Sequence, residues 1–228
     1  MTDNLADLSA RYGEKGTDME KVNAATPKYE FRGTIVDRDL IMKEVRLRTA
    51  HKWMDRELIM KMPHTMVCDI PIIMHVWVGK ASLLVNEDLL RAFSIDAGEL
   101  MKTAFRNTAE KSDFSFTTLS AKCGEPLVDD PVKVVTTKNF MFGAAAIAIE
   151  PMLMAFARSL NDDFYIIPSS VHELMILPKG KAMMTVPEME RMVYLINRTE
   201  VNAQDVLSDN VYEFCRNASE GNRVRKAE

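Results

Sequence analysis

One segment, residues 66–78, carries an apolar side chain at every second position, and this pattern restricts the chain to folds with at least one half-buried strand. The apolar face consists of Met66, Cys68, Ile70, Ile72, Met74, Val76 and Val78. The opposite face includes Asp69, Pro71, His75 and Trp77. Because proline has no N–H to donate to a strand ladder, Pro71 predicts an edge strand or a bulge.

Signals for helices and for strands are interspersed along the rest of the chain. Residues with capping side chains predict helix starts after Asn86, Asp96 and Thr185. Hydrophobic spacing predicts further helices within 35–44, 53–62 and 143–160, and Pro151 should kink the last of them. Strands are expected from about residue 45, over 81–85, 114–120 and 132–137, and twice within 163–178. Residues 206–214 fit either a strand or a short helix.

This order of elements predicts an α+β fold, with a mixed, mostly antiparallel sheet and helices packed on it. A crossover through the 143–160 helix would permit one parallel strand pair. Residues 1–33 contain glycines, a proline and mixed charge, and they are expected to form an N-terminal arm or linker. Residues 34–215 are expected to form a single α+β domain, followed by a flexible C-terminal tail over 216–228.

The composition excludes several classes of protein. Hydrophobic residues make up 47% and charged residues 27% of the chain, as in an ordinary globular protein. The net charge of -4 gives no basic surface for phosphate, so no nucleic-acid partner is expected. No apolar run is long enough to span a bilayer, so no membrane association is expected either.

The cysteines indicate a reducing compartment. Cys68, Cys123 and Cys215 are odd in number and far apart, which is unlike a disulfide framework. The first residues also lack the apolar core of a secretory signal. A cytoplasmic location is therefore expected.

The stretch 163–178, DFYIIPSSVHELMILP, brings a serine, a histidine and an acid together between two predicted strands joined at residues 168–170. Ser170 with His172 suggests a hydrolase in which serine is the nucleophile and histidine the base, and Cys123 is a second candidate nucleophile. In a strand Glu173 would point away from His172, so it could not orient the imidazole. The alternative interpretation is a turn whose hydroxyls bond the local backbone.

Other polar residues are weaker candidates for binding. Lys138 and Asn139 precede a predicted helix, where backbone amides can hold phosphate. Asp209, with Asp205, Ser208 and Glu213, could form a docking surface for a basic partner, and Glu173 is a further weak candidate for binding. Asp69 lies in an apolar strand and would need a partner if buried, for which Arg46 and Arg48 are candidates.

No metal site and no cofactor are expected. Asp69 and His75 share a strand face but lie about 20 Å apart along a straight strand, too far to share one ion. The chain also has no Cys-x-x-Cys pair and no helical histidine signature.

Several short motifs resemble one protein family. They are MPH at 62–64 with CDIPI at 68–72, RNT at 106–108, TKN at 137–139 with GAA at 143–145, IIPSSVHELMILP at 166–178, and INRTEVNAQDVLSDNVYEF at 196–214. Their order and spacing resemble the bacterial domain-of-unknown-function family 5688, found mostly in Firmicutes. The resemblance covers residues 46–214 and does not place residues 1–45. It implies a bacterial cytosolic protein and supplies no activity, cofactor or catalytic residue.

Two functions remain open from the sequence. The first is a non-enzymatic domain that binds a macromolecule, expected to be a protein, in a phage or mobile-element context. The 17 methionines allow an adaptable partner surface, although a methionine-rich core explains them better, because most of them lie in apolar periodic segments. The second is the hydrolase that uses Ser170 or Cys123 with His172.

Overall fold

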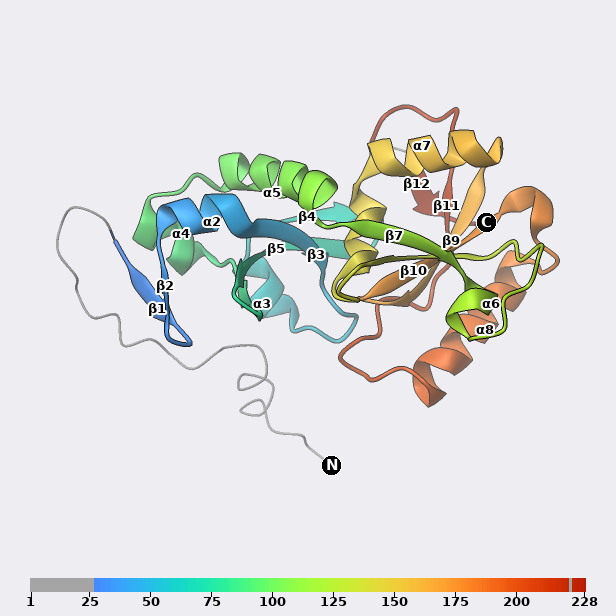
Figure 1. Ribbon diagram of the computed structural model, residues 1–228, viewed down its shortest axis with the longest axis horizontal. Helices are drawn as coiled ribbons and strands as arrows, with labels where there is room; N and C mark the ends of the chain where they lie inside the picture. The colour runs from blue at the N-terminus through green and yellow to red at the C-terminus, as the bar shows by residue number, and fades with distance from the viewer. Residues whose placement is uncertain (1–26, 222) are drawn as a thin grey trace.

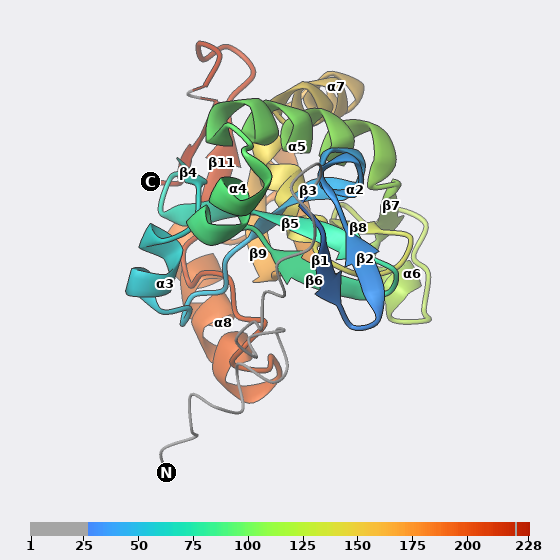
Figure 2. The same ribbon diagram turned by 90° about the vertical axis from the view of Figure 1, so that its left-hand side faces the viewer.

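The computed structural model describes residues 27–221 and 223–228. These residues form two larger open sheets and one two-stranded sheet, and all strand pairs among them are antiparallel. The two larger sheets lie side by side along the long axis of the molecule (Figure 1). Helices α5 (Ala97–Lys111) and α7 (Glu150–Leu160) lie on the same side of them (Figure 2). The predicted α+β class is confirmed, but the parallel pair permitted by the sequence is not formed in this part of the chain.

Strand β5 (Ile70–Val78) is the centre of the four-stranded sheet. Along one edge it pairs with β3 (Val45–Thr49). Along the other edge it pairs first with β4 (His64–Val67) and then with β6 (Ala81–Leu84). The predicted apolar face is confirmed over β5, whose buried members are Ile70, Ile72, Met74, Val76 and Val78.

Two details of the predicted strand are wrong. The chain turns at Cys68 and Asp69, with Cys68 at a left-handed φ of 55°, so residues 66–78 form a hairpin of two strands. Asp69 therefore lies in a turn and not on a strand face. The strand is also central in its sheet, and not an edge strand as Pro71 predicted. It tolerates Pro71 because this residue lies beyond Thr49, the last residue of β3 in the register, where no N–H is needed.

Two helices of the first half start at the predicted caps, Asn86 and Asp96. The helices of this half are α2 (Arg38–Glu44), α3 (Arg56–Met60), α4 (Glu87–Phe93) and α5. The Asp96 carboxylate accepts the Glu99 N–H at 2.8 Å, which opens α5. Further along α5, Thr108 Oγ1 accepts the Leu47 N–H at 2.7 Å and fastens the helix to β3.

The six-stranded sheet has the order β12-β11-β9-β10-β8-β7. Its strands are β7 (Phe114–Thr118), β8 (Lys133–Thr137), β9 (Phe164–Ser170), β10 (Glu173–Pro178), β11 (Tyr212–Phe214) and β12 (Val224–Lys226). Helix α7 packs on one face, and α8 (Val186–Thr199) packs on the other through Val186, Met189 and Val193. Both faces of β9 are consequently buried, Phe164 and Ile166 on one and Ile167 on the other.

Short helices complete this half: α6 (Leu119–Lys122) and the 3-10 helices η1 (Gly143–Ala148) and η2 (Lys179–Lys181). The single kinked helix predicted for 143–160 is wrong, because Ile149 separates η1 from α7. Pro151 lies in the first turn of α7, where its missing N–H breaks no helical bond.

The turn within the 163–178 stretch also lies later than predicted. Pro168, Ser169 and Ser170 belong to β9, and Val171 with His172 forms the turn to β10. Pro168 is tolerated because β11 pairs only as far as Ile166, and because a β-bulge interrupts the register at this end of the hairpin.

Strand pairs lie at both ends of the predicted domain. Residues 1–26 of the predicted arm lie outside the described residues, but β1 (Tyr29–Phe31) pairs with β2 (Thr34–Val36). At the other end, β12 pairs with β11, and Arg223 forms an ion pair with Glu150 of α7. The segment predicted as a flexible tail therefore contributes an edge strand, because its backbone completes the ladder of β11.

The backbone of Gly143 joins the loop after β8 to the β9–β10 turn. Its N–H donates to the His172 carbonyl at 3.0 Å, and Thr136 Oγ1 donates to the same carbonyl at 2.9 Å. A Cβ at position 143 would lie 2.5 Å from both this carbonyl oxygen and Thr136 Cα. Only glycine fits a backbone approach this close.

We therefore expect Gly143→Ala to lower the free energy of unfolding by about 2 kcal/mol or more, since backbone must move on both sides of the added methyl group. Urea unfolding followed by circular dichroism measures the change. The matched control is Gly98→Ala, which adds a methyl group at an exposed position in α5 and should change stability by less than about 1 kcal/mol. Equal stability of the two variants would contradict the role given to Gly143.

Candidate functional site

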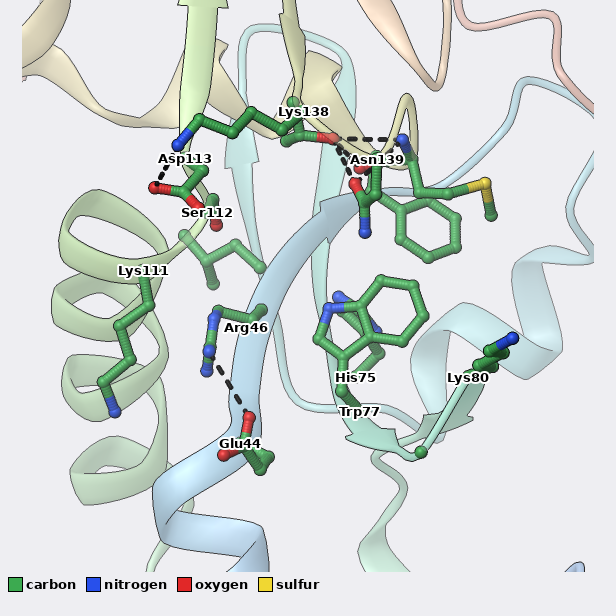
Figure 3. Close-up of a pocket in the computed structure, with 15 residues that line it drawn as sticks. Glu44, Arg46, His75, Trp77, Lys80, Lys111, Ser112, Asp113, Lys138 and Asn139 are labelled. Atoms are coloured by element: carbon green, nitrogen blue, oxygen red, sulfur yellow. Dashed lines mark hydrogen bonds and ion pairs between the residues drawn. The ribbon is translucent and has the colours of Figure 1, made fainter.

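A cleft of about 680 Å³ lies beside β3 and β5, below the loop that follows β8 (Figure 3). Its walls come from segments that are far apart in the sequence, within residues 44–47, 75–80, 111–113 and 137–142. The cleft is therefore a product of the tertiary fold, formed where the four-stranded sheet meets the end of α5 and the β8–η1 loop.

Aromatic rings form the floor of this cleft. His75 and Trp77 alternate on β5, on the face opposite its apolar core residues, and their ring centroids are 4.9 Å apart in an edge-to-face arrangement. The Phe142 ring lies 4.9 Å from His75 and 5.7 Å from Trp77. Behind it, the buried Arg48 guanidinium lies 4.0 Å from the Phe142 centroid. Because His75 and Phe142 contact the Trp77 ring at inclined angles, they hold that ring in a fixed orientation at the cleft.

The β8–η1 loop is held in an unusual conformation. Thr137 Oγ1 donates to Asn139 Oδ1 at 2.5 Å and accepts the Met141 N–H at 3.0 Å. Phe140 and Phe142 both adopt left-handed backbone, with φ of 58° and 57°. Bulky residues rarely take this conformation unless their surroundings impose it, and such residues gather at binding sites.

The charged residues of the cleft are mainly cationic. Among the described residues that line it, Arg46, Lys80, Lys111 and Lys138 are positive and Glu44 and Asp113 are negative. Both acids already have partners, because Glu44 lies 3.4 Å from Arg46 and Asp113 lies 3.5 Å from Lys138. This local excess of positive charge contrasts with the net charge of -4 for the whole chain.

Several hydrogen-bond donors at the cleft have no protein acceptor. Within residues 27–221 and 223–228, the Lys80 ammonium, the Trp77 indole N–H and the Asn139 side-chain amide donate to no other group. Figure 3 shows the Asn139 amide nitrogen directed toward the region of His75 and Trp77. The site therefore presents donors to a ligand, while its carboxylates are occupied.

His75 is neutral in this environment. Burial, with added repulsion from Arg48 and Arg46, lowers its pKa well below the ordinary value of 6.5. Its Nδ1 lies 2.9 Å from Ser82 Oγ on the neighbouring strand. The imidazole is thus a buried, hydrogen-bonded part of the floor.

Ser170 and His172 contact each other through the backbone of His172 and not through its imidazole. Ser170 Oγ accepts the backbone N–H of His172 at 3.1 Å. The imidazole faces other groups: Nδ1 accepts the Phe142 N–H at 3.2 Å, and Nε2 lies 3.3 Å from Asp205 Oδ1. Neither ring nitrogen is directed to Ser170, and this geometry matches the alternative interpretation of a turn that bonds local backbone.

The remaining candidates for the hydrolase and binding roles lie apart from His172 or have other partners. Glu173 forms an ion pair with Lys122 and accepts a hydrogen bond from Ser169 Oγ at 3.1 Å. Cys123 is exposed at the end of α6. All three cysteines of the chain are free thiols.

Asp69 and Asp209 line a second, smaller cavity of about 340 Å³. Asp69 accepts from Tyr212 Oη at 2.7 Å and lies 3.3 Å from Lys226, so Arg46 and Arg48 are not its partners. The Asp209 carboxylate binds Lys52 and Arg198. Burial would raise the pKa of Asp209, but these hydrogen bonds outweigh it and hold the pKa well below the ordinary value of 3.8.

Of the predicted binding residues, Lys138 and Asn139 line the larger cleft. The sequence did not indicate Arg46, Trp77, Lys80 and Lys111 as members of the same site. One signal for this site was present in the sequence, the placement of His75 and Trp77 on the polar face of a predicted strand. No local pattern relates positions 46, 80 and 111 to it.

The described residues contain neither a metal-binding cluster nor a membrane-spanning helix. The structure brings together no three His, Cys, Asp or Glu side chains there that could hold a metal ion. None of the described helices combines the length and the apolar character needed to cross a membrane.

Comparisons with known proteins relate the chain to a protein family. The sequence model of a family of unknown function (DUF5688) matches residues 17–216. This match begins earlier than the resemblance seen in the motifs and includes residues 17–45, which the motifs did not place. No curated protein matches the chain. No solved structure matches it either.

The histidines predict how stability depends on pH. Burial is the largest cause of a lowered pKa at His51, His75 and His172, with Arg48 adding to it. The folded state therefore binds fewer protons than the unfolded state, and we expect stability to fall as the pH decreases below about 6.5. Urea unfolding at pH 7.5, 6.5 and 5.5 measures this loss.

Lowered carboxylate pKa values at Asp209 and Glu213 contribute only at more acidic pH, because the ordinary values there are 3.8 and 4.5. A stability that stays constant or rises between pH 6.5 and 5.5 would contradict the neutral state of the buried histidines.

Proposed function

The chain belongs to the DUF5688 family, whose function is unknown, and we propose from the cleft itself that the protein is a binding domain for an anionic ligand that carries a flat ring. Acidic groups of the ligand bind at the cationic rim, and the ring packs on the aromatic floor. No step of covalent chemistry is part of this proposal.

The surplus of donors in the cleft carries the proposal. Lys80, Trp77 and Asn139 each have N–H groups without a protein acceptor among the described residues, whereas Glu44 and Asp113 are paired with cations. A ligand that supplies acceptors and negative charge satisfies these donors, and a cationic ligand would compete with them. Phosphate and carboxylate oxygens are the acceptors that lysine and amide groups bind most strongly.

The floor supports the flat ring. Trp77 is only partly buried, and its ring is held at a fixed angle by His75 and Phe142. An aromatic ring supported in this way stacks on a planar group at little entropic cost. Since the His75 imidazole is neutral, it adds no charge to this surface.

The cleft volume of about 680 Å³ lies within the range of small-molecule sites, roughly 300–1,000 Å³. A macromolecular partner remains compatible with the same chemistry if it inserts an acidic group beside an aromatic side chain. The expected protein partner is therefore tested together with the small-molecule ligands. The phage or mobile-element context stays a prediction.

The hydrolase hypothesis stays a prediction that gains no support from the site, because both imidazole nitrogens of His172 face groups other than Ser170. We also infer a bacterial, cytoplasmic protein. The free state of Cys68, Cys123 and Cys215 supports a reducing compartment.

Tryptophan fluorescence tests the proposed ligand class. The chain has two tryptophans, and Trp53 is 57% exposed and lies outside the cleft, so a Trp53→Phe background leaves Trp77 as the reporter. We expect adenosine triphosphate to change the Trp77 emission, and adenosine or inorganic phosphate alone to bind at least tenfold more weakly, because each satisfies only half of the site. An acidic peptide that contains tyrosine tests the macromolecular form.

Lysine variants give the matched comparison. Lys80→Ala with Lys138→Ala should weaken binding by about tenfold or more, since each charge-assisted hydrogen bond contributes roughly 1.5–3 kcal/mol. Lys181→Ala, which removes an exposed lysine outside the cleft, should leave affinity unchanged. The proposal fails if no probe changes Trp77 emission, or if the cleft and control variants bind equally.

A further inference from the structure

The aromatic floor of the cleft is hydrogen-bonded to the β9–β10 turn through one histidine. Phe142, the residue that completes the aromatic floor, donates its backbone N–H to His172 Nδ1 at 3.2 Å. The two rings lie 5.6 Å apart, and His172 belongs to the β9–β10 turn, outside the cleft lining. The His172 imidazole therefore reaches the cleft through Phe142.

We propose that His172 is a positioning residue for the cleft, whose neutral imidazole holds Phe142 in place and whose protonation releases it. As an acceptor, Nδ1 must carry a lone pair, so the single ring proton is on Nε2, facing Asp205 Oδ1 at 3.3 Å. Adding a proton to Nδ1 places an N–H against the Phe142 N–H. Both groups are then donors, and the hydrogen bond is lost.

The left-handed backbone of Phe142 makes this bond important. At a φ of 57° a phenylalanine needs its surroundings to keep it in place. The adjacent Gly143 N–H is held by the His172 carbonyl, and Thr136 Oγ1 donates to the same carbonyl. Those bonds do not depend on the imidazole, so protonation loosens Phe142 while the turn itself stays attached.

Charged groups on each neighbouring segment act on the imidazole. Asp205 in the loop before β11 favours the protonated ring, and Arg48 on β3 opposes it. The same two residues act on His51 in the same directions, since Asp205 raises its pKa and Arg48 lowers it. Next to His172 in the chain, Glu173 is already neutralised by Lys122. Burial outweighs Asp205 and lowers the pKa of His172 below 6.5, so the neutral form is present at neutral pH.

Hydrogen exchange of the Phe142 amide tests this role without any ligand. Nuclear magnetic resonance on the full chain from pH 7.5 to 4.5 gives the protection factor of that amide, corrected for intrinsic exchange, and the ring resonances of His172 report its protonation. Because one proton breaks one bond, we expect protection to fall about tenfold per pH unit below the pKa of His172. Amides of β5 and β10 should keep their protection.

Two variants separate positioning from general stability. His172→Gln retains an acceptor oxygen that does not titrate, so Phe142 should stay protected and independent of pH. His172→Ala removes the acceptor, and Phe142 should be unprotected throughout. Unchanged Phe142 protection in the wild type over the whole range, or an equal pH dependence in His172→Gln, would overturn the proposal.

A second measurement rests on the proposed function. Affinity for adenosine triphosphate, followed by Trp77 emission in the Trp53→Phe background, should fall more steeply on acidification with His172 than with the His172→Gln substitution. If adenosine triphosphate does not bind at any pH, the proposed ligand is wrong, and the exchange of the Phe142 amide still decides the role of His172.

Discussion

The close contact between Gly143 and the β9–β10 turn is the constraint on which the rest of the site depends. It brings the backbone of η1 against the His172 carbonyl and Thr136 with no space for a side chain. From this contact the loop after β8 reaches across to the four-stranded sheet, where Phe142 meets His75 and Trp77. The two larger sheets thereby share one hydrophobic core and one cleft.

Burial and charge act together around this contact. Arg48 is 1% exposed and lies against the Phe142 ring, and its positive charge helps to keep His51, His75 and His172 neutral. Neutral imidazoles can accept hydrogen bonds, so the same charge that lowers their pKa values supports the bond from Phe142 to His172. The exposed Lys80 and Lys138 line the cleft, and among them Lys138 forms an ion pair with Asp113.

Local elements were predictable where their signals lie close together in the chain. The helix starts at Asn86, Asp96 and Thr185 were correct because a capping side chain and its backbone partner are within three residues of each other. The β9–β10 turn was misplaced because proline usually ends a strand. Here Pro168 is accommodated by the end of β11 and by a bulge, and both depend on neighbouring strands.

The sequence by itself determined the α+β class, the helix caps and the buried face of β5, because periodicity and capping are local properties. It predicted that Glu173 would not orient His172, because neighbours on a strand point to opposite faces; in the structure His172 lies in the turn, and its Nε2 faces Asp205. Only the tertiary structure decided that Arg46, Trp77, Lys80, Lys111 and Asn139 form one cleft. Their separation along the chain leaves no pattern to detect, and their distances are fixed by how β5, α5 and the β8–η1 loop pack together.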